Sequence, residues 1–168
     1  MSKKNILWIG PAFDPSFAST QKAVSIAAAD WQIKTLSVLS GYFNFYTVSH
    51  LPEPYWPKGK LFPKSRMDDL WKGCQRYGLR YFNLPGFREK SIRAGYSNIC
   101  RYLLNEIVFD GVVSYTSSQS IASIASEFSK DFNCPWISII PGIVPDLVAD
   151  GEVALSAFTF KEIKKRRV

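Results

Sequence analysis

The sequence has little of what metal and redox chemistry usually needs. Its 168 residues include one histidine and three cysteines. The cysteines, Cys74, Cys100 and Cys134, are too far apart along the chain for a zinc pattern or a redox pair. We therefore expect no metal and no resident cofactor.

Several phosphate-binding and catalytic motifs are missing from the sequence. No Gly-x-Gly-x-x-Gly fingerprint follows the first apolar run, where Gly10 stands alone, so a dinucleotide site is unsupported. No Gly-Lys-Ser/Thr triplet occurs, which excludes a P-loop, and no Asp-x-Asp pair is present to hold a metal with a nucleotide diphosphate. Without a Gly-x-Ser-x-Gly elbow, we expect His50 to be an ordinary loop residue.

Long apolar runs are absent as well. No stretch approaches the ~20 apolar residues that a transmembrane helix needs. The run at 6–9 follows basic residues but is too short for the core of a signal peptide. An odd number of cysteines in a non-secretory chain indicates reduced thiols. We expect a cytoplasmic protein that at most associates with a membrane surface.

Positive charge is in excess and unevenly placed. The chain has 21 Lys and Arg against 14 Asp and Glu, a net charge of +7. Eleven of the basic and three of the acidic residues lie in 58–101, so this segment carries +8. Aromatic residues are interleaved with these charges, which suits an anionic membrane surface; nucleic acid ranks lower, because no nucleic-acid module fits. The candidate surface contacts are Lys58, Lys60, Arg88, Lys90 and Arg93, and a second basic cluster occupies 161–167.

Short apolar runs alternate with segments of helical periodicity. Strands are predicted over 5–9, 43–48, 79–84, 110–115 and 135–140. Helices are predicted to begin at Ser19 or Thr20, at Ser65 with an end at Gly78, and at Ser117 or Ser118. A longer helix is predicted through 92–107, and the tail from Glu152 is expected to be helical.

This alternation predicts an α/β, Rossmann-like fold, with a mostly parallel sheet and helices on both faces. The whole of 1–168 is predicted to form a single domain. Ligands of such sheets bind at the carboxyl ends of the strands, which here are the segments 10–14, 50–52, 115–117 and 141–142.

Two segments carry a more specific signal. ILWIGPAFDP at 6–15, with ASTQKAVSIA at 18–27, joins a strand, a glycine-containing loop and a helix rich in small residues. FDGVVSYTSS at 109–118, followed by IASIA at 121–125, is a strand with a polar end. These segments resemble the first and fourth strand regions in the N-terminal domain of GT-B glycosyltransferases of the family 4 type. PWISII at 135–140, followed by Asp146, resembles the next strand and its acidic loop, which extends the resemblance over roughly 5–160.

The resemblance implies an acceptor-binding domain. The intact enzyme would move a sugar from a nucleotide donor to a glycan or lipid-linked acceptor without a catalytic metal. In that family the C-terminal domain binds the donor and carries a pair of glutamates. None of the four glutamates after residue 100 pair at that spacing. We therefore expect the chain to be inactive without a C-terminal domain or a partner chain, and we assign no catalytic residue.

The resemblance also implies two sets of site residues, each with a plainer alternative. Residues near the donor phosphates or the cleft would be Gly10, Phe13 and Asp14. Residues that bind the acceptor would be Tyr115, Thr116 and Ser117. The first set would lie near the donor diphosphate if a second domain closed over it, and backbone N–H groups at the helix start would help to bind phosphate. It is explained equally well by a plain strand-to-helix turn, in which Gly10 gives backbone freedom and Asp14 is a turn or cap residue. In the second set, Ser117 serves more simply as a helix cap.

Two functions of other classes stay open. In the first, the chain is a non-catalytic subunit that recruits a catalytic partner to a membrane through its basic face. In the second, it is a different nucleotide-binding domain of Rossmann-like or flavodoxin-like form.

Overall fold

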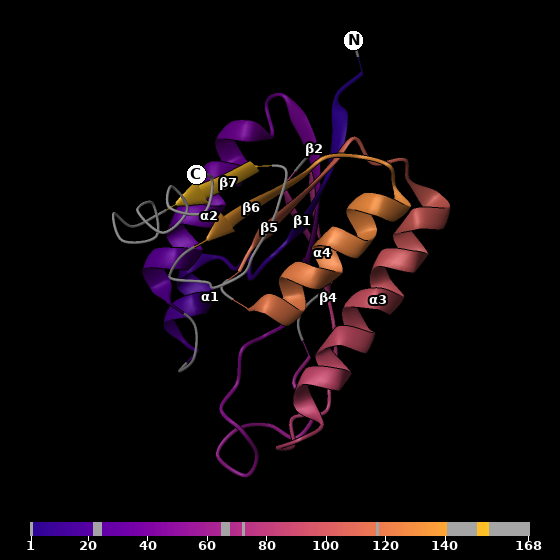
Figure 1. Cartoon of the computed structure of the whole chain (residues 1–168). Helices are drawn as coiled ribbons and strands as arrows, with labels where there is room; N and C mark the ends of the chain where they lie inside the picture. The colour runs from indigo at the N-terminus through magenta and orange to yellow at the C-terminus, as the bar shows by residue number, and fades with distance from the viewer. Residues whose placement is uncertain are drawn as a thin grey trace.

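A computed structural model of the chain describes residues 2–21, 25–64, 68–71, 73–116, 118–140 and 151–154. These residues form a seven-stranded sheet in the order β3-β4-β2-β1-β5-β6-β7 (Figure 1). Every neighbouring pair of strands is parallel except β3 and β4. The strands are β1 (Lys4–Ile9), β2 (Phe43–Ser49), β3 (Asp68–Trp71), β4 (Cys74–Gly78), β5 (Gly111–Tyr115), β6 (Trp136–Ile140) and β7 (Gly151–Ala154).

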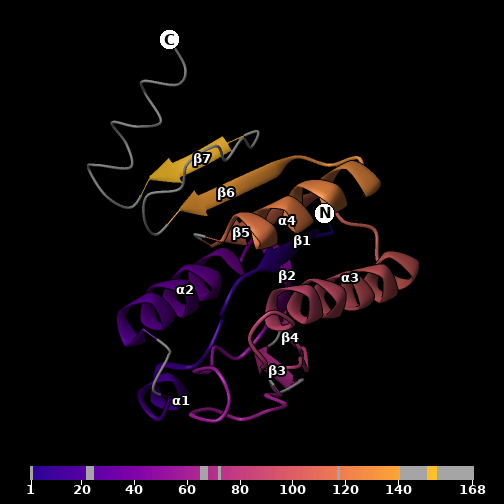
Figure 2. The same cartoon turned by 60° about the horizontal axis from the view of Figure 1, so that its bottom comes forward.

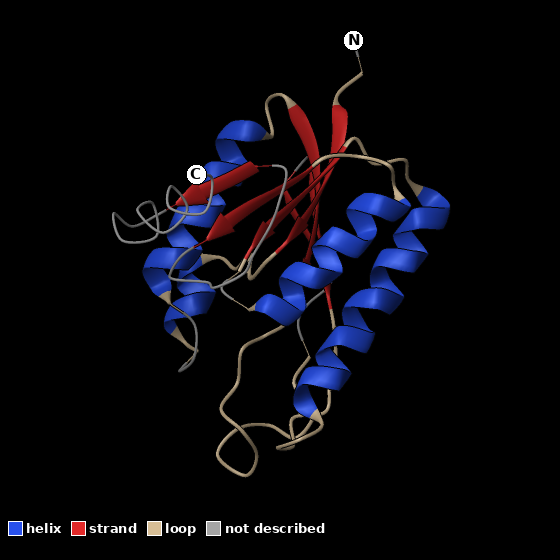
Figure 3. Ribbon diagram, viewed as in Figure 1, coloured by secondary structure: helices blue, strands red, loops and turns tan. Residues whose placement is uncertain are grey.

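Helices cover both faces of this sheet. The helix α2 (Ile26–Leu39) lies on one face, and α3 (Arg88–Glu106) and α4 (Gln119–Asp131) lie side by side on the other (Figure 1, Figure 2). The short helix α1 (Pro15–Ser19) precedes α2 (Figure 3). The predicted α/β, Rossmann-like fold with a mostly parallel sheet is confirmed.

The central strand β1 is buried on both faces. Its Leu7 packs with Tyr96 and Ile124 beneath α3 and α4, whereas Trp8 packs with Leu36 of α2. None of these five side chains is more than 1% exposed. A parallel strand that is covered on both faces needs apolar side chains at successive positions, which is the reason for the uninterrupted apolar run at 6–9.

The side-chain amide of Gln32 connects β1 to the helix α2. The side chain of Gln32 is fully buried, and its Oε1 accepts a hydrogen bond from the indole Nε1 of Trp8 at 3.3 Å. Its Nε2 donates to the carbonyl oxygens of Pro11 and Ala28, each at 3.3 Å. Gln32 therefore links β1, the loop that follows it and α2. Both polar atoms of its amide have hydrogen-bond partners, which avoids the cost of ~1–3 kcal/mol for burying an unsatisfied polar group.

Most of the predicted elements are confirmed. The strands over 5–9, 43–48, 110–115 and 135–140 correspond to β1, β2, β5 and β6, and the helix through 92–107 corresponds to α3. Ser118 is the N-cap residue of α4, as predicted for one of two serines. The predicted start of the first helix is wrong, since Ser19 and Thr20 close α1 as its last residue and its C-cap. α2 begins only after Ser25, whose hydroxyl accepts a hydrogen bond from the backbone of Ala28 at 3.3 Å.

The helix predicted between Ser65 and Gly78 is also wrong. β3 and β4 form an antiparallel hairpin there, which turns at Gly73 with a φ of +91°. Along β4 the buried positions alternate, and they hold Cys74, Arg76 and Gly78. A charged side chain and a glycine at buried positions conceal the apolar alternation that identifies a strand.

The strand predicted over 79–84 is replaced by irregular pairing with the preceding loop. Lys64 and Arg80 form an isolated antiparallel bridge. Further along, the backbone N–H of Asn83 donates to the carbonyl oxygen of Leu61 at 2.9 Å. Only the start of the segment still bonds to the sheet, where the backbone N–H of Leu79 donates to the carbonyl oxygen of Ser49 at 3.1 Å.

Some predicted features lie outside the described residues, namely Ser65, Ser117, the strand end at 141–142, Asp146 and the basic cluster at 161–167. Glu152 is described, and it lies in β7, so the tail does not begin as the expected helix.

The order of the strands reverses between β1 and β5. β2 and β4 lie on one side of β1, whereas β5, β6 and β7 lie on the other. The connections therefore leave the centre of the sheet in opposite directions, which opens a crevice at the carboxyl ends of β1 and β5. Ligands of Rossmann-like sheets bind at this position.

The substitution Gly10→Ala is expected to lower the free energy of unfolding by about 1–3 kcal/mol. An added Cβ would lie 3.0 Å from the Cβ of Tyr115 and 3.1 Å from the Oε1 of Gln32, both held in the core. Chemical denaturation measures the effect. Gly41→Ala is the control, because its Cβ would meet only the carbonyl oxygen of Val38, at 3.4 Å. Unchanged stability of Gly10→Ala would contradict a tight constraint at the end of β1.

Candidate functional site

The crevice contains a cavity of about 250 Å³. Gly10 and Pro11 line it from the end of β1, His50 from the end of β2, and Thr116 from the end of β5. The start of α3 adds Arg88. Ser118, the N-cap residue of α4, follows closely after Thr116 and lines the cavity as well, so four segments that are distant in sequence meet here.

His50 lies deeper in this site than an ordinary loop residue would. Its ring is packed edge-on against the rings of Tyr81 and Tyr96, with centroids 5.8 Å away in both cases. Its Nδ1 lies 3.0 Å from the hydroxyl oxygen of Tyr96. Burial, with a smaller contribution from the nearby Arg88, lowers the pKa of His50 to about 4. The ring is therefore neutral at pH 7.

The phenol of Tyr96 is the hydrogen-bond partner of Nδ1 of His50. Burial raises the pKa of Tyr96 far above its ordinary value, so its hydroxyl keeps its proton. The phenol oxygen accepts a hydrogen bond from the backbone of His50, and its own hydrogen is then free to donate to Nδ1. In the tautomer in which Nδ1 accepts this hydrogen, the neutral ring carries its proton on Nε2, and in the other tautomer Nε2 is an acceptor.

Arg88 brings positive charge to the crevice. It is the first residue of α3, and its guanidinium lies over the rings of Tyr55 and Tyr81, 4.8 Å and 5.7 Å from their centroids. The neighbouring Glu89 supplies a carboxylate, whose Oε2 accepts a hydrogen bond from the hydroxyl of Ser120 at 3.0 Å. The site thus offers one cation and one anion at the start of the same helix.

The structure separates the three residues predicted near the donor phosphates. Gly10 lines the crevice, but Phe13 is buried against Phe17, with centroids 5.6 Å apart, and lies 5.7 Å from the guanidinium of Arg76. Asp14 caps α1, where its Oδ1 accepts a hydrogen bond from the backbone of Ser16 at 2.8 Å. The pKa of Asp14 is lowered chiefly by the hydroxyl of the same serine. Asp14 is therefore a helix cap, as the alternative of a plain strand-to-helix turn predicts.

The predicted acceptor residues lie at the crevice as far as they are described. Tyr115 and Thr116 both line it. The Tyr115 ring stacks on Trp31 of α2 with centroids 5.3 Å apart, and burial raises the pKa of its phenol. The hydroxyl oxygen of Thr116 accepts a hydrogen bond from the backbone N–H of Ser118 at 2.9 Å. Ser117 lies outside the described residues.

The predicted basic contacts are distributed over three places. Arg88 belongs to the crevice, while Lys58 and Lys60 line a second, more open hollow of about 430 Å³ with Glu53. Lys90 is exposed on α3. Arg93 forms an ion pair with Glu127 of α4.

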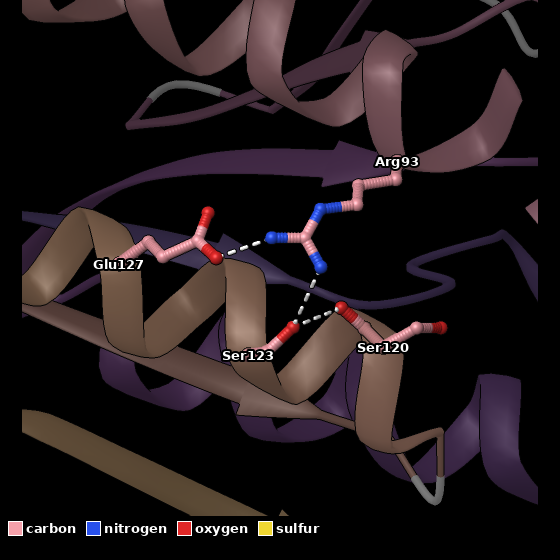
Figure 4. A network of polar contacts seen from close by, with 4 residues as sticks. All are labelled: Arg93, Ser120, Ser123 and Glu127. Carbon is pink, nitrogen blue, oxygen red and sulfur yellow. Dashed lines mark hydrogen bonds and ion pairs between the residues drawn. The ribbon is translucent and has the colours of Figure 1, made fainter. Parts of the chain in front are cut away.

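Arg93 joins the two helices on its face of the sheet. Its guanidinium forms an ion pair with Glu127 of α4 and donates a hydrogen bond to the hydroxyl of Ser123 at 3.3 Å (Figure 4). The same hydroxyl donates to the carbonyl oxygen of Ser120 at 2.8 Å. This engagement leaves Arg93 less available to an external anion than the exposed lysines.

Among the residues that the structure describes, no three His, Cys, Asp or Glu side chains gather in a way that would hold a metal ion. The described helices also include none that is long and apolar enough to cross a membrane. Burial raises the pKa of the Cys74 and Cys100 thiols to about 12, so both stay protonated and unreactive at pH 7.

The segment 50–52 was predicted to lie at a strand end, but His50 itself was expected to be an ordinary loop residue, and Tyr96 was given no role in the site. His50 follows β2 directly, which places it at the same edge of the sheet as Gly10 and Thr116. That position was the available signal. Tyr96 lies on the apolar face of α3, where its ring is indistinguishable in sequence from an ordinary core residue.

Protonation of His50 is expected to oppose folding. Its pKa is about 4 in the folded protein and near its ordinary value of 6.5 in the unfolded chain. Between these values the unfolded state binds more protons, so the free energy of unfolding falls as the pH drops, by up to ~1.4 kcal/mol per pH unit. Urea denaturation across this range measures the slope, with His50→Gln as the comparison. Identical slopes for the two proteins would contradict a buried neutral ring.

No family model, curated protein or solved structure matches this chain. The chemistry of the crevice is therefore inferred from its own residues. They offer the neutral imidazole of His50, a guanidinium from Arg88, a carboxylate from Glu89 and the hydroxyl of Thr116. Such a set can bind a polyhydroxylated ligand that carries negative charge.

Proposed function

We propose that the chain is the acceptor-side domain of a GT-B glycosyltransferase and that the crevice receives the acceptor. One observation carries this proposal. The two segments that resemble the family, 6–15 and 109–118, are almost a hundred residues apart, yet Gly10 of the first and Thr116 of the second line the same cavity. A shared family origin accounts for both the resemblance and the meeting point.

The polar groups of the crevice suit a sugar acceptor. Hydroxyl groups both donate and accept hydrogen bonds, and the cavity offers the neutral imidazole of His50 and an acceptor in Glu89. Arg88 adds a fixed positive charge, which favours an acceptor that carries a phosphate. In the reaction, an acceptor hydroxyl loses its proton and attacks the donor sugar, and the nucleoside diphosphate leaves. The donor would be bound by a C-terminal domain or a partner chain.

A second candidate is nucleotide binding by this domain itself. The order of the six parallel strands is the one found in Rossmann folds that bind dinucleotides, and the cavity lies at the point where that order reverses. The loop after β1 has a single glycine, Gly10, in place of the usual three, so the backbone offers a pyrophosphate less room. The acceptor function therefore ranks first.

The substitution Arg88→Ala is expected to weaken acceptor affinity by about tenfold, because a charge-assisted hydrogen bond is lost. Isothermal titration with water-soluble phosphorylated oligosaccharides measures this change. Arg101→Ala is the matched control, since Arg101 is exposed on the same helix but does not line the cavity.

The same titrations are repeated with sugar nucleotides, and sugar transfer is assayed after a donor-binding domain is supplied. Transfer that depends on both components supports the acceptor function. Tight binding of a nucleotide by the chain alone would favour the second candidate. No affinity for acceptors and no transfer with the donor-binding domain present would contradict the proposal.

A further inference from the structure

Four aromatic side chains are exposed close together beside the crevice. Tyr55, Trp56, Phe62 and Phe87 are 47%, 48%, 49% and 61% exposed, respectively. Three of them lie on the loop 53–64, and Phe87 immediately precedes α3. In Figure 1 this loop and the start of α3 form the lower end of the molecule, away from the sheet. We call these four residues the aromatic surface.

Contacts of rings and guanidinium groups connect Tyr55, Phe62 and Phe87 across the chain, and Trp56 follows Tyr55 directly in the loop. Phe82 stacks against Phe62 with centroids 5.3 Å apart and meets the edge of Phe87 at 6.2 Å. The guanidinium of Arg80 lies 5.3 Å from the Phe62 centroid, as that of Arg88 lies over Tyr55. The exposed rings therefore belong to one continuous surface.

A buried asparagine holds the loop in the shape that exposes these rings. The side-chain Nδ2 of Asn83 donates to the carbonyl oxygens of Pro54 and Lys60, at 2.7 Å and 2.9 Å. The carbonyl oxygen of Asn83 accepts a hydrogen bond from the backbone of Trp56 at 3.2 Å. Because Asn83 is fully buried, the loop cannot fold its aromatic side chains inward without breaking these bonds.

Basic side chains surround the aromatic surface. Lys58, Lys60 and Lys64 are exposed on the same loop, and Lys90 is exposed on the first turn of α3. Arg80 and Arg88 stand over its rings. The acidic residues of 53–64 and 80–90 are Glu53 and Glu89, so these two segments carry six positive and two negative charges.

We infer that the aromatic surface docks on an anionic lipid bilayer. Tryptophan and tyrosine favour the headgroup region, where an apolar ring and a polar edge are both accommodated, and lysines near the membrane are attracted by anionic headgroups. Exposed aromatic side chains alone would favour many partners. Their combination with a rim of positive charge favours a lipid bilayer, which has an apolar interior and negatively charged headgroups.

Docking in this orientation has a consequence for the acceptor. Arg88 belongs both to the rim of the aromatic surface and to the lining of the crevice, so the crevice lies next to the membrane when the surface is docked. An acceptor attached to a lipid would then reach the crevice without leaving the bilayer. Docking depends on the surface alone, whereas the lipid-linked acceptor rests on the function proposed above.

Vesicle co-sedimentation of the full chain tests the docking. The vesicles contain phosphatidylcholine alone, or phosphatidylcholine and phosphatidylglycerol in about equal parts, and no glycan or nucleotide. We expect binding to the anionic vesicles at low salt, and a roughly thirtyfold loss of affinity in the double variant Lys58→Ser, Lys60→Ser. The control variant Lys34→Ser, Lys130→Ser removes the same charge from α2 and the end of α4, and is expected to bind as the wild type does.

The contribution of the rings is measured separately. Brominated lipids in the anionic vesicles are expected to quench tryptophan fluorescence, and Trp56→Phe is expected to abolish most of this quenching. Phe87→Ser is expected to weaken binding severalfold, whereas Tyr42→Ser is the control, since Tyr42 is 72% exposed in the turn between α2 and β2. Thermal unfolding of each variant checks that the fold is kept.

Each possible result decides the inference. Anionic binding that needs the loop lysines, with quenching at Trp56, supports it. No binding, or binding that needs the lysines but shows no quenching and no effect of Phe87→Ser, overturns it. Binding of oligothymidylate that is lost in the same variants, without vesicle binding, also overturns it and assigns the surface to single-stranded nucleic acid. Because no acceptor is present, failure here leaves the titrations of the crevice unaffected.

Discussion

Gly10 lies against Tyr115 where the central strands β1 and β5 end, and the rest of the site depends on this close approach. Any side chain at position 10 would meet the Tyr115 backbone and Gln32, both of which are fixed in the core. The amide of Gln32 binds the loop after β1 from the other side, through the carbonyl oxygen of Pro11. The crevice is therefore bounded by backbone that packing holds in place, as a site that must orient a ligand requires.

The electrostatics of the crevice follow from burial. The packing of His50 between two tyrosines removes its charge at pH 7, and Arg88 beside it reinforces this effect. The site is left with a neutral imidazole deep inside and a cation at its rim. The same cation stacks on Tyr55 of the aromatic surface, so the position of one guanidinium connects ligand binding with the surface that we expect to meet a membrane.

Much of the site could be predicted from the sequence, because strand ends are visible there. Gly10 and Thr116 each follow a strong apolar run, and parallel strands bring such positions to one edge. The sequence did not indicate that Phe13 and Asp14 would lie outside the crevice that Gly10 lines. The helix α1, which Asp14 caps, is only about one turn long and has no periodicity that could be recognised. The hairpin of β3 and β4 was missed because Arg76, a charged residue, occupies a buried strand position.

The sequence by itself determined the alternation of buried strands and amphipathic helices, since burial on both faces demands continuous apolar runs and burial on one face demands helical periodicity. It also determined the excess of positive charge over 58–101. Only the tertiary structure decided which of those charged side chains form ion pairs, as Arg93 does with Glu127, and which lie at the surface beside exposed aromatic rings. The reason is physical: partners such as these lie more than thirty residues apart, and their meeting depends on how the helices pack.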